Sequence, residues 1–90
     1  MTARLILRGT DLRYVITDHL LRHGPQTIAD LLEQLDYHGF EVKNPASKRV
    51  SDALRCEVRH GRVRRLRRGR YGPAAMPRST EHRIHTRAMA

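Results

Sequence analysis

Three glycines, Gly24, Gly39 and Gly61, divide the first two thirds of the sequence into segments that repeat apolar residues at helical spacing. Within each segment the apolar side chains recur three and four residues apart, which is the pattern of a helix with one buried face. Glycine readily adopts the left-handed conformation that often follows the last turn of a helix. The pattern therefore predicts three amphipathic helices, each ending at a glycine.

The first predicted helix begins with Thr10 as its N-cap and Asp11 in its first turn. Its inward face holds Leu12, Val15, Ile16, His19 and Leu20. A smaller apolar stripe, Tyr14 and Leu21, lies on the opposite side and needs a cover. Two covers remain open: a second copy of the chain in a homodimer, or the chain's own ends through Leu5, Ile6, Leu7 or Ile84.

The second predicted helix has the clearest start, because Thr27 is a good N-cap directly before an apolar repeat. Gly39 is placed to end the helix, and Phe40 to fold back on its last turn. The inward residues are Ile28, Leu31, Leu32 and Leu35.

The third predicted helix differs from the second in its outward face, which is cationic. It starts either at Asn44-Pro45, since proline suits the first helical position, or at Ser47 as a cap. Its inward stripe is expected to be Val50, Ala53, Leu54 and Val58. The outward cluster is Lys48, Arg49, Asp52, Arg55 and Arg59.

Residues 62–72 are too short and too closely bounded by glycine for another helix. Strand-forming residues flank a glycine-containing turn there, which predicts a β-hairpin. Val63 and Leu66 do not share the alternation of a regular strand, so a bulge or a strand end lies between them. Which arginines of the hairpin point outward therefore stays open. Beyond a linker-like stretch, residues 80–89 are expected to form a short helix capped by Ser79.

Positive charge is concentrated in one part of the chain. The formal net charge of the 90 residues is +9, and residues 43–70 hold eleven basic and only two acidic side chains. Sixteen of the eighteen cationic residues are arginines, which suit phosphates and guanine edges, although GC-rich codons would produce the same bias. Such a concentration implies a polyanionic partner. The alternative is a solvated face that binds nothing specific.

Several other functions find little support. The single cysteine, Cys56, excludes an internal disulfide, and no apolar stretch approaches the length of a membrane span or a signal peptide. The pairs His19/His23 and Cys56/His60 have chelating i, i+4 spacing, but no CxxC or HExxH motif accompanies them. We therefore expect a soluble cytoplasmic protein with no metal, cofactor or small-molecule effector, and no enzymatic activity.

Two carboxylates, Asp52 and Glu57, each have more than one candidate partner. Asp52 either accepts a hydrogen bond from a cytosine or pairs within its own helix with Lys48 or Arg55. Glu57 projects inward, where a buried carboxylate needs a partner. The candidate partners, which would orient the hairpin, are Arg62, Arg64 and His19.

Residues 11–73 resemble the winged helix-turn-helix family of small bacterial DNA-binding proteins. Three motifs carry the resemblance: Thr27-Ile28-Ala29-Asp30-Leu31-Leu32, Ser51-Asp52-Ala53-Leu54-Arg55, and Gly61-Arg62-Val63 followed by Arg68-Gly69-Arg70-Tyr71-Gly72. The resemblance implies that the third helix enters the major groove while the hairpin, the wing, follows phosphates or enters the minor groove. It assigns Ser47, Lys48, Arg49, Ser51, Asp52 and Arg55 to the groove, and Arg67, Arg68 and Arg70 to the wing. The connection at residues 40–44 is longer than the family's simple turn.

The sequence thus predicts an α+β winged helix-turn-helix domain at residues 10–73, with an N-terminal segment at 1–9 and a tail or short helix at 74–90. Its expected function is binding of double-stranded DNA as a transcriptional regulator. Two other readings remain open: an architectural, nucleoid-associated protein with little sequence preference, and an RNA- or ribosome-binding winged helix.

Overall fold

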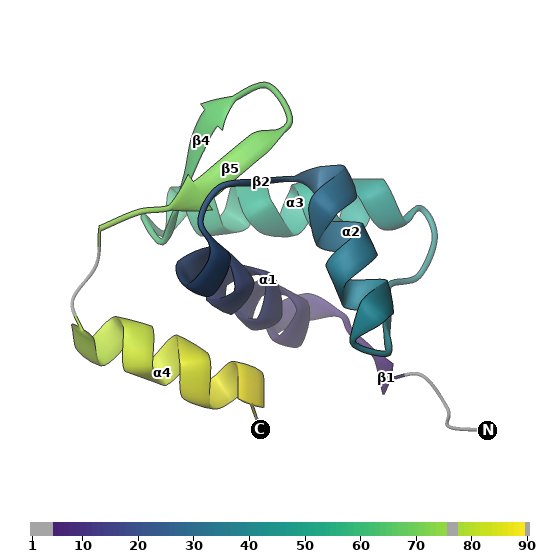
Figure 1. Ribbon diagram of the computed structural model, residues 1–90, viewed down its shortest axis with the longest axis horizontal. Coiled ribbons are helices and arrows are strands. Elements are labelled where there is room, and N and C mark those ends of the chain that lie inside the picture. Colours follow the sequence, from purple (N-terminus) through teal and green to yellow (C-terminus); the bar gives the residue numbers. More distant parts are fainter. Residues whose placement is uncertain (1–4, 76–77, 90) are drawn as a thin grey trace.

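The chain folds into four helices and two small sheets, as the computed structural model shows for residues 5–75 and 78–89 (Figure 1). This is the expected α+β class, with three helices followed by a hairpin. No helix in that part of the chain is long and apolar enough to cross a membrane. The helices are α1 (Gly9–His23), α2 (Ile28–Tyr37), α3 (Ala46–Arg59) and α4 (Arg78–Met89), and the strands are β1 (Leu5–Ile6), β2 (Gln26–Thr27), β3 (Phe40–Glu41), β4 (Val63–Arg67) and β5 (Arg70–Pro73).

The predicted helix starts were right for α2 and wrong for α1. Thr27 caps α2 in a capping box, in which its hydroxyl accepts from Asp30 N and the Asp30 carboxylate accepts from Thr27 N, each at 3.1 Å. Helix α1 begins at Gly9, ahead of Thr10, and its N-cap Arg8 makes no side-chain capping bond. Thr10 lies inside the helix, where its hydroxyl accepts from Arg13 Nη2 at 3.2 Å.

The other helix boundaries lie close to the predicted ones. Helix α3 begins between its two expected starts, with Pro45 as N-cap and Ala46 as first residue. Helix α4 begins at Arg78, one residue before the Ser79 that was expected as its cap. Gly39 and Gly61 follow the caps of α2 and α3 with φ of 80° and 74°, and Gly24 is the cap of α1 with φ of 79°. These positive φ angles explain why the three glycines end the helices.

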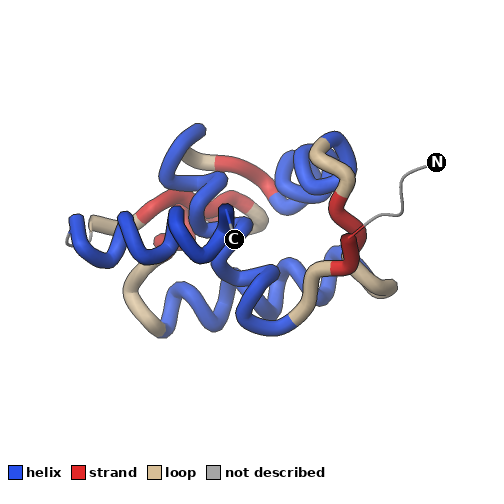
Figure 2. Tube along the Cα trace, turned by 90° about the horizontal axis from the view of Figure 1, so that it is seen from below, coloured by secondary structure: helices blue, strands red, loops and turns tan. Residues whose placement is uncertain are grey.

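The hairpin joins a three-stranded antiparallel sheet in the order β2-β5-β4, with Arg65 opposite Tyr71 and Thr27 opposite Arg70. The register shifts between Arg65 and Arg67, so the pairing is irregular at Leu66, next to the stretch from Val63 to Leu66 where the sequence predicted a bulge or a strand end. Val63 is buried, whereas Leu66 is 44% exposed on the opposite face. A second pair, β1 with β3, is parallel and lies away from the hairpin (Figures 1 and 2).

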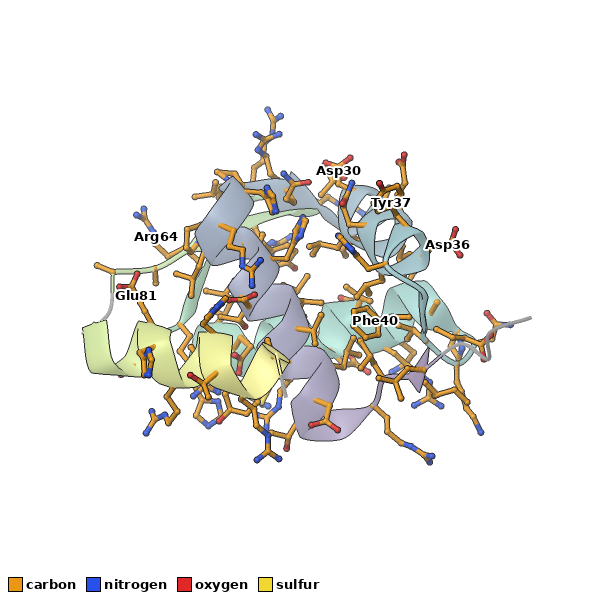
Figure 3. All side chains as sticks on the ribbon, turned by 60° about the horizontal axis from the view of Figure 1, so that its bottom comes forward. Asp30, Asp36, Tyr37, Phe40, Arg64 and Glu81 are labelled. Atoms are coloured by element: carbon orange, nitrogen blue, oxygen red, sulfur yellow. The ribbon has the colours of Figure 1, made fainter. Side chains whose placement is uncertain are left out.

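The core lies between α1, α2, α3 and the hairpin and consists mainly of leucine, isoleucine and valine. Leu7, next to β1, belongs to this core, and its backbone N donates to Glu41 O at 2.8 Å. Phe40 packs against the core beneath α2, while Asp36 and Tyr37 project from the outer side of that helix (Figure 3). Val58, expected to face inward, is 37% exposed, whereas Glu57 next to it is fully buried.

Helix α4 covers α1, as Figure 1 shows. Ile84 is fully buried, and His85 Nδ1 lies 2.9 Å from Oδ1 of the buried Asp18 on α1. The Arg87 guanidinium lies over the Tyr14 ring at 5.8 Å. Helix α4 therefore covers the Tyr14 side of α1 within the chain. This is one of the two covers that the sequence left open, the other being a second copy of the chain.

Candidate nucleic-acid interface

The site is built around α3, whose two sides differ sharply in chemistry. Val50, Leu54 and Glu57 are fully buried, whereas the cationic side chains point to solvent. This division follows from the helical repeat, which places residues three and four apart on one face. The exposed polar residues of α3 are Ser47, Lys48, Arg49, Asp52, Arg55 and Arg59.

A groove of about 530 Å³ lies between α3 and the hairpin. Helix α3 contributes Ser51, Arg55 and Val58, and the hairpin contributes Arg65, Arg68, Gly69 and Tyr71, with Ile28 at the start of α2. The hairpin turn is held there because Ile28 N donates to Gly69 O at 3.3 Å. The structure thus brings Arg55 of the predicted helix face and Arg68 of the predicted wing to one surface.

The strand alternation decides which arginines face the groove. Arg65 lies opposite the buried Tyr71 and lines the groove, while Arg64 lies opposite Gly72 on the other face of the hairpin. Figure 3 shows Arg64 pointing away from the molecule. The sequence did not select Arg65, because the bulge left the orientation of these side chains undecided.

Asp52 pairs with cations of its own helix, which is one of the two roles that the sequence left open for it. Its Oδ2 accepts from Lys48 Nζ at 2.9 Å, and its Oδ1 lies 3.7 Å from Arg55 Nη1. The hydrogen bond from Lys48, together with the positive charges of Lys48 and Arg55, lowers the pKa of the Asp52 carboxyl. Asp52 is thus an ionised partner of two cations within α3.

Arg70 lies beside the start of α2 and is half-buried, unlike the exposed Arg67 and Arg68 at the hairpin tip. The pKa of Asp30 is lowered by its hydrogen bonds with the backbone and hydroxyl of Thr27, and the charge of Arg70 adds to the effect. Arg70 therefore faces an acidic group, which distinguishes it from the other predicted wing residues.

Glu57 connects α3, α1 and the hairpin. Its Oε1 accepts from Thr17 Oγ1 at 2.7 Å and from Arg62 Nε at 2.9 Å, and its Oε2 accepts from Arg62 Nη2. Of the three partners expected for Glu57, the structure selects Arg62 and adds Thr17. The carboxylate raises the pKa of the Arg62 guanidinium. These contacts orient the segment that leads into β4.

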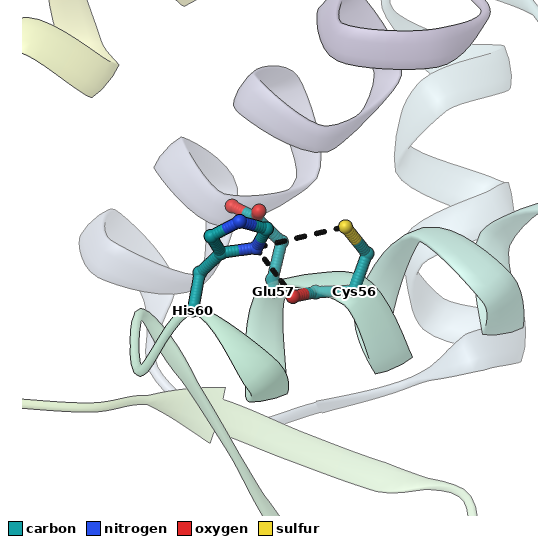
Figure 4. Close-up of side chains that lie close together, drawn as sticks. All are labelled: Cys56, Glu57 and His60. Atoms are coloured by element: carbon teal, nitrogen blue, oxygen red, sulfur yellow. Dashed lines mark hydrogen bonds between the residues drawn. The ribbon is translucent and has the colours of Figure 1, made fainter.

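The side chains of Cys56, Glu57 and His60 bring three potential metal-ligand atoms within 4.8 Å of one another (Figure 4). Each of these side chains has a protein partner. Arg13 Nη1 donates to Cys56 Sγ at 2.9 Å, His60 Nδ1 lies 2.8 Å from Cys56 O, and Glu57 binds Arg62. These three side chains are thus held by contacts within the protein.

Comparison with known proteins gives one informative likeness. No protein-family model matches the chain, and no curated protein matches its sequence. The fold resembles the crystal structure of the circadian clock associated protein Pex from Anabaena, with a TM-score of 0.63. That likeness covers 97% of this chain and 79% of the other, at 13% sequence identity, and it shows a shared fold.

Proposed function

We propose that this chain is a winged helix-turn-helix protein that binds double-stranded DNA without catalysis and acts as a transcriptional regulator. Helix α3 enters the major groove, and the β4–β5 hairpin serves as the wing. The observation that carries the proposal is the groove in which Arg55 of α3 and Arg65 and Arg68 of the hairpin meet. The fold shared with Pex is compatible with this arrangement.

Electrostatics supports a nucleic-acid partner. The exposed cations of α3 and the hairpin would repel one another in isolation, and a phosphate backbone removes that repulsion. If roughly six of them contact phosphates, the logarithm of the affinity falls against the logarithm of the salt concentration with a slope of about −5.

Base recognition rests on few side chains. Arg55 lines the groove and has the fork that binds guanine O6 and N7, and the Ser51 hydroxyl lies beside it. Asp52 already accepts from Lys48, so its expected contact with cytosine competes with that bond. Arg55 is therefore the residue on which sequence preference depends most.

The test is the double variant Arg55→Ala with Arg68→Ala, compared with Arg64→Ala with Arg83→Ala. Both pairs remove two exposed positive charges, but neither Arg64 nor Arg83 lines the groove. We expect the first pair to abolish measurable binding to a duplex, as followed by fluorescence anisotropy, while the second pair binds nearly as wild type. Unchanged binding by the Arg55/Arg68 variant would refute the proposal.

An architectural, nucleoid-associated role is the second candidate, and the pairing of Asp52 favours it by leaving fewer free groups for base recognition. Competition separates the two roles. A regulator keeps a specific complex against a large excess of random duplex, whereas an architectural protein is titrated away. Selection from a randomised duplex pool gives either an enriched motif or none.

RNA binding receives less support from the structure. Sequence-specific RNA modules stack bases on exposed aromatic rings, and Tyr71 in the three-stranded sheet is only 8% exposed. Binding of duplex DNA and RNA of the same sequence at one salt concentration compares the two partners directly. Tighter binding of the RNA would overturn the assignment to DNA.

A further inference from the structure

A second groove flanks α3 on the side away from the hairpin. It has a volume of about 230 Å³ and lies between the start of α1 and the outer part of α3. Three arginines from different places in the sequence contribute to it: Arg8, Arg13 and Arg49. The remaining lining residues are Gly9, Leu12, Asp52, Ala53 and Cys56.

The charge of this groove is positive despite the presence of Asp52. That carboxylate is bound by Lys48 at 2.9 Å and lies 3.7 Å from Arg55, so its charge is already balanced by cations of α3. Arg8 and Arg49 are exposed at the rim. The groove therefore presents guanidinium groups to an incoming anion.

Arg13 is held in place at the groove instead of being freely mobile. Its Nη1 donates to Cys56 Sγ at 2.9 Å, its Nη2 donates to Thr10 Oγ1 at 3.2 Å, and Glu57 Oε2 lies 3.9 Å away. A guanidinium fixed in this way loses less side-chain entropy when it binds an anion. The first turn of α1 adds backbone N–H groups, because its N-cap Arg8 provides no side-chain acceptor.

The two grooves border the exposed face of α3 from opposite sides. At 3.6 residues per turn, Ser51, Arg55 and Val58 lie roughly 140° around the helix from Arg49 and Cys56. The exposed Lys48 and Arg59 fall between these two edges. A helix lying in the major groove has a phosphate backbone on each side, and this arrangement provides a cationic groove for both.

We propose that the groove lined by Arg8, Arg13 and Arg49 binds a backbone phosphate of the DNA strand that lies across α3 from the hairpin. This inference rests on the proposed DNA binding and adds a second point of attachment to it. Together the two grooves fix the direction and depth of α3 in the major groove.

The first experiment uses the double variant Arg8→Ala with Arg49→Ala, with Arg64→Ala and Arg83→Ala as the charge-matched control. We expect the Arg8/Arg49 variant to bind duplex DNA about tenfold more weakly than the control. We also expect its salt slope to be shallower by about one for each lost phosphate contact. Circular dichroism checks that the variant keeps its helices.

The result separates this inference from the proposed function. If the Arg8/Arg49 variant binds like the control while the Arg55/Arg68 variant does not bind, the second phosphate contact is wrong and DNA binding stands. If the Arg55/Arg68 variant binds like wild type, the proposed function itself fails.

The second experiment uses Cys56, the chain's single thiol, as a reporter within the groove. We expect saturating duplex to slow alkylation of Cys56 by N-ethylmaleimide several-fold in the wild-type protein, and much less in the Arg8/Arg49 variant. Equal protection of both proteins, or no protection of either, would overturn the inference.

The same alkylation measurement is repeated with inorganic phosphate in place of duplex, at matched ionic strength and with chloride as control. It distinguishes a groove that binds a DNA backbone phosphate from one that binds free phosphate. Slower alkylation with duplex supports a backbone phosphate, whether or not inorganic phosphate has the same effect. Slower alkylation with inorganic phosphate alone, and not with duplex, would assign the groove to a free phosphate and overturn the contact with DNA.

Discussion

Glu57 and Arg62 form a partly buried ion pair at the point where α3 ends and the hairpin begins. Arg62 Nε donates to Glu57 Oε1 at 2.9 Å, and the backbone N of Arg62 donates to Glu57 O at 3.0 Å. The Glu57 side chain is fully buried and that of Arg62 is 17% exposed. One side-chain and one backbone hydrogen bond thus fix the direction in which the chain leaves α3 toward the hairpin. The groove between α3 and the hairpin depends on that direction.

Replacing one member of this pair tests its structural role. In Arg62→Ala the Glu57 carboxylate stays buried without its main partner, and breaking a buried pair in this way costs about 3–5 kcal/mol. We expect the free energy of unfolding, measured by urea denaturation, to fall by that order. Arg64→Ala, two residues along the chain and exposed, is the control and should change it little. A loss in Arg62→Ala no greater than in the control would show that Thr17 alone satisfies the carboxylate.

The capping box at the start of α2 predicts a dependence of stability on pH. The hydrogen bonds of Asp30 with Thr27 lower the pKa of its carboxyl in the folded state below its ordinary value of 3.8. The contribution of the ionised group is therefore complete above pH 3.8 and is lost as the pH falls through the folded-state pKa. Wild type should exceed Asp30→Asn in stability at pH 6, and the difference should shrink below pH 3.8.

Denaturation curves of the two proteins across this pH range provide the measurement. Glu33→Gln serves as a control, because Glu33 is an exposed carboxylate on the same helix. If the difference between wild type and Asp30→Asn were constant down to the lowest pH, the carboxylate would not act through its charge.

Two features explain why the helices were largely predictable from the sequence. Glycine ends a helix through its own backbone freedom, and Thr27 caps one through contacts within three residues, so both signals are local. The start of α1 was misplaced because Thr10 is an equally legal cap, yet its hydroxyl binds Arg13 inside the helix. Local propensity does not distinguish a threonine that caps a helix from one that accepts a side-chain hydrogen bond within it.

The parts that could not be predicted depend on contacts between distant segments. The β1–β3 pair joins two-residue strands far apart in the chain, and so short a strand carries no periodic signal. Likewise, Arg13 meets Cys56 only because α1 packs across α3. Val58 looked like a core residue from its spacing, but the hairpin leaves it 37% exposed at the groove.

Three neighbouring histidines, two on α1 and one at the C-cap of α2, predict a second dependence on pH, at milder acidity. Burial lowers the pKa of His19 below its ordinary value of 6.5, and the nearby His23 and His38 lower it further. The rings of His19 and His23 lie 4.4 Å apart between centroids. In the unfolded chain His19 takes up a proton more readily, so stability falls as the pH drops below 6.5 toward the folded-state pKa.

The variant His19→Gln should reduce this loss because it removes the group that protonates preferentially in the unfolded state. We expect the melting temperature of wild type to drop more between pH 7.5 and pH 5.5 than that of His19→Gln. His82→Gln, an exposed position on α4, serves as the control. Equal drops in wild type and His19→Gln would show that His19 does not contribute to the acid sensitivity.

The packing of α4 on α1 determines whether the Tyr14 side of α1 is available to a second copy of the chain. Ile84 is fully buried there, and truncating a buried isoleucine to alanine costs about 2–5 kcal/mol. We expect Ile84→Ala to lower the free energy of unfolding by that order and to increase protease cleavage in α4. Arg83→Ala, next to it and exposed, should do neither. If Ile84→Ala were as stable as Arg83→Ala, α4 would not cover α1 in solution, and a homodimer through the Tyr14 face would become the better explanation of that apolar stripe.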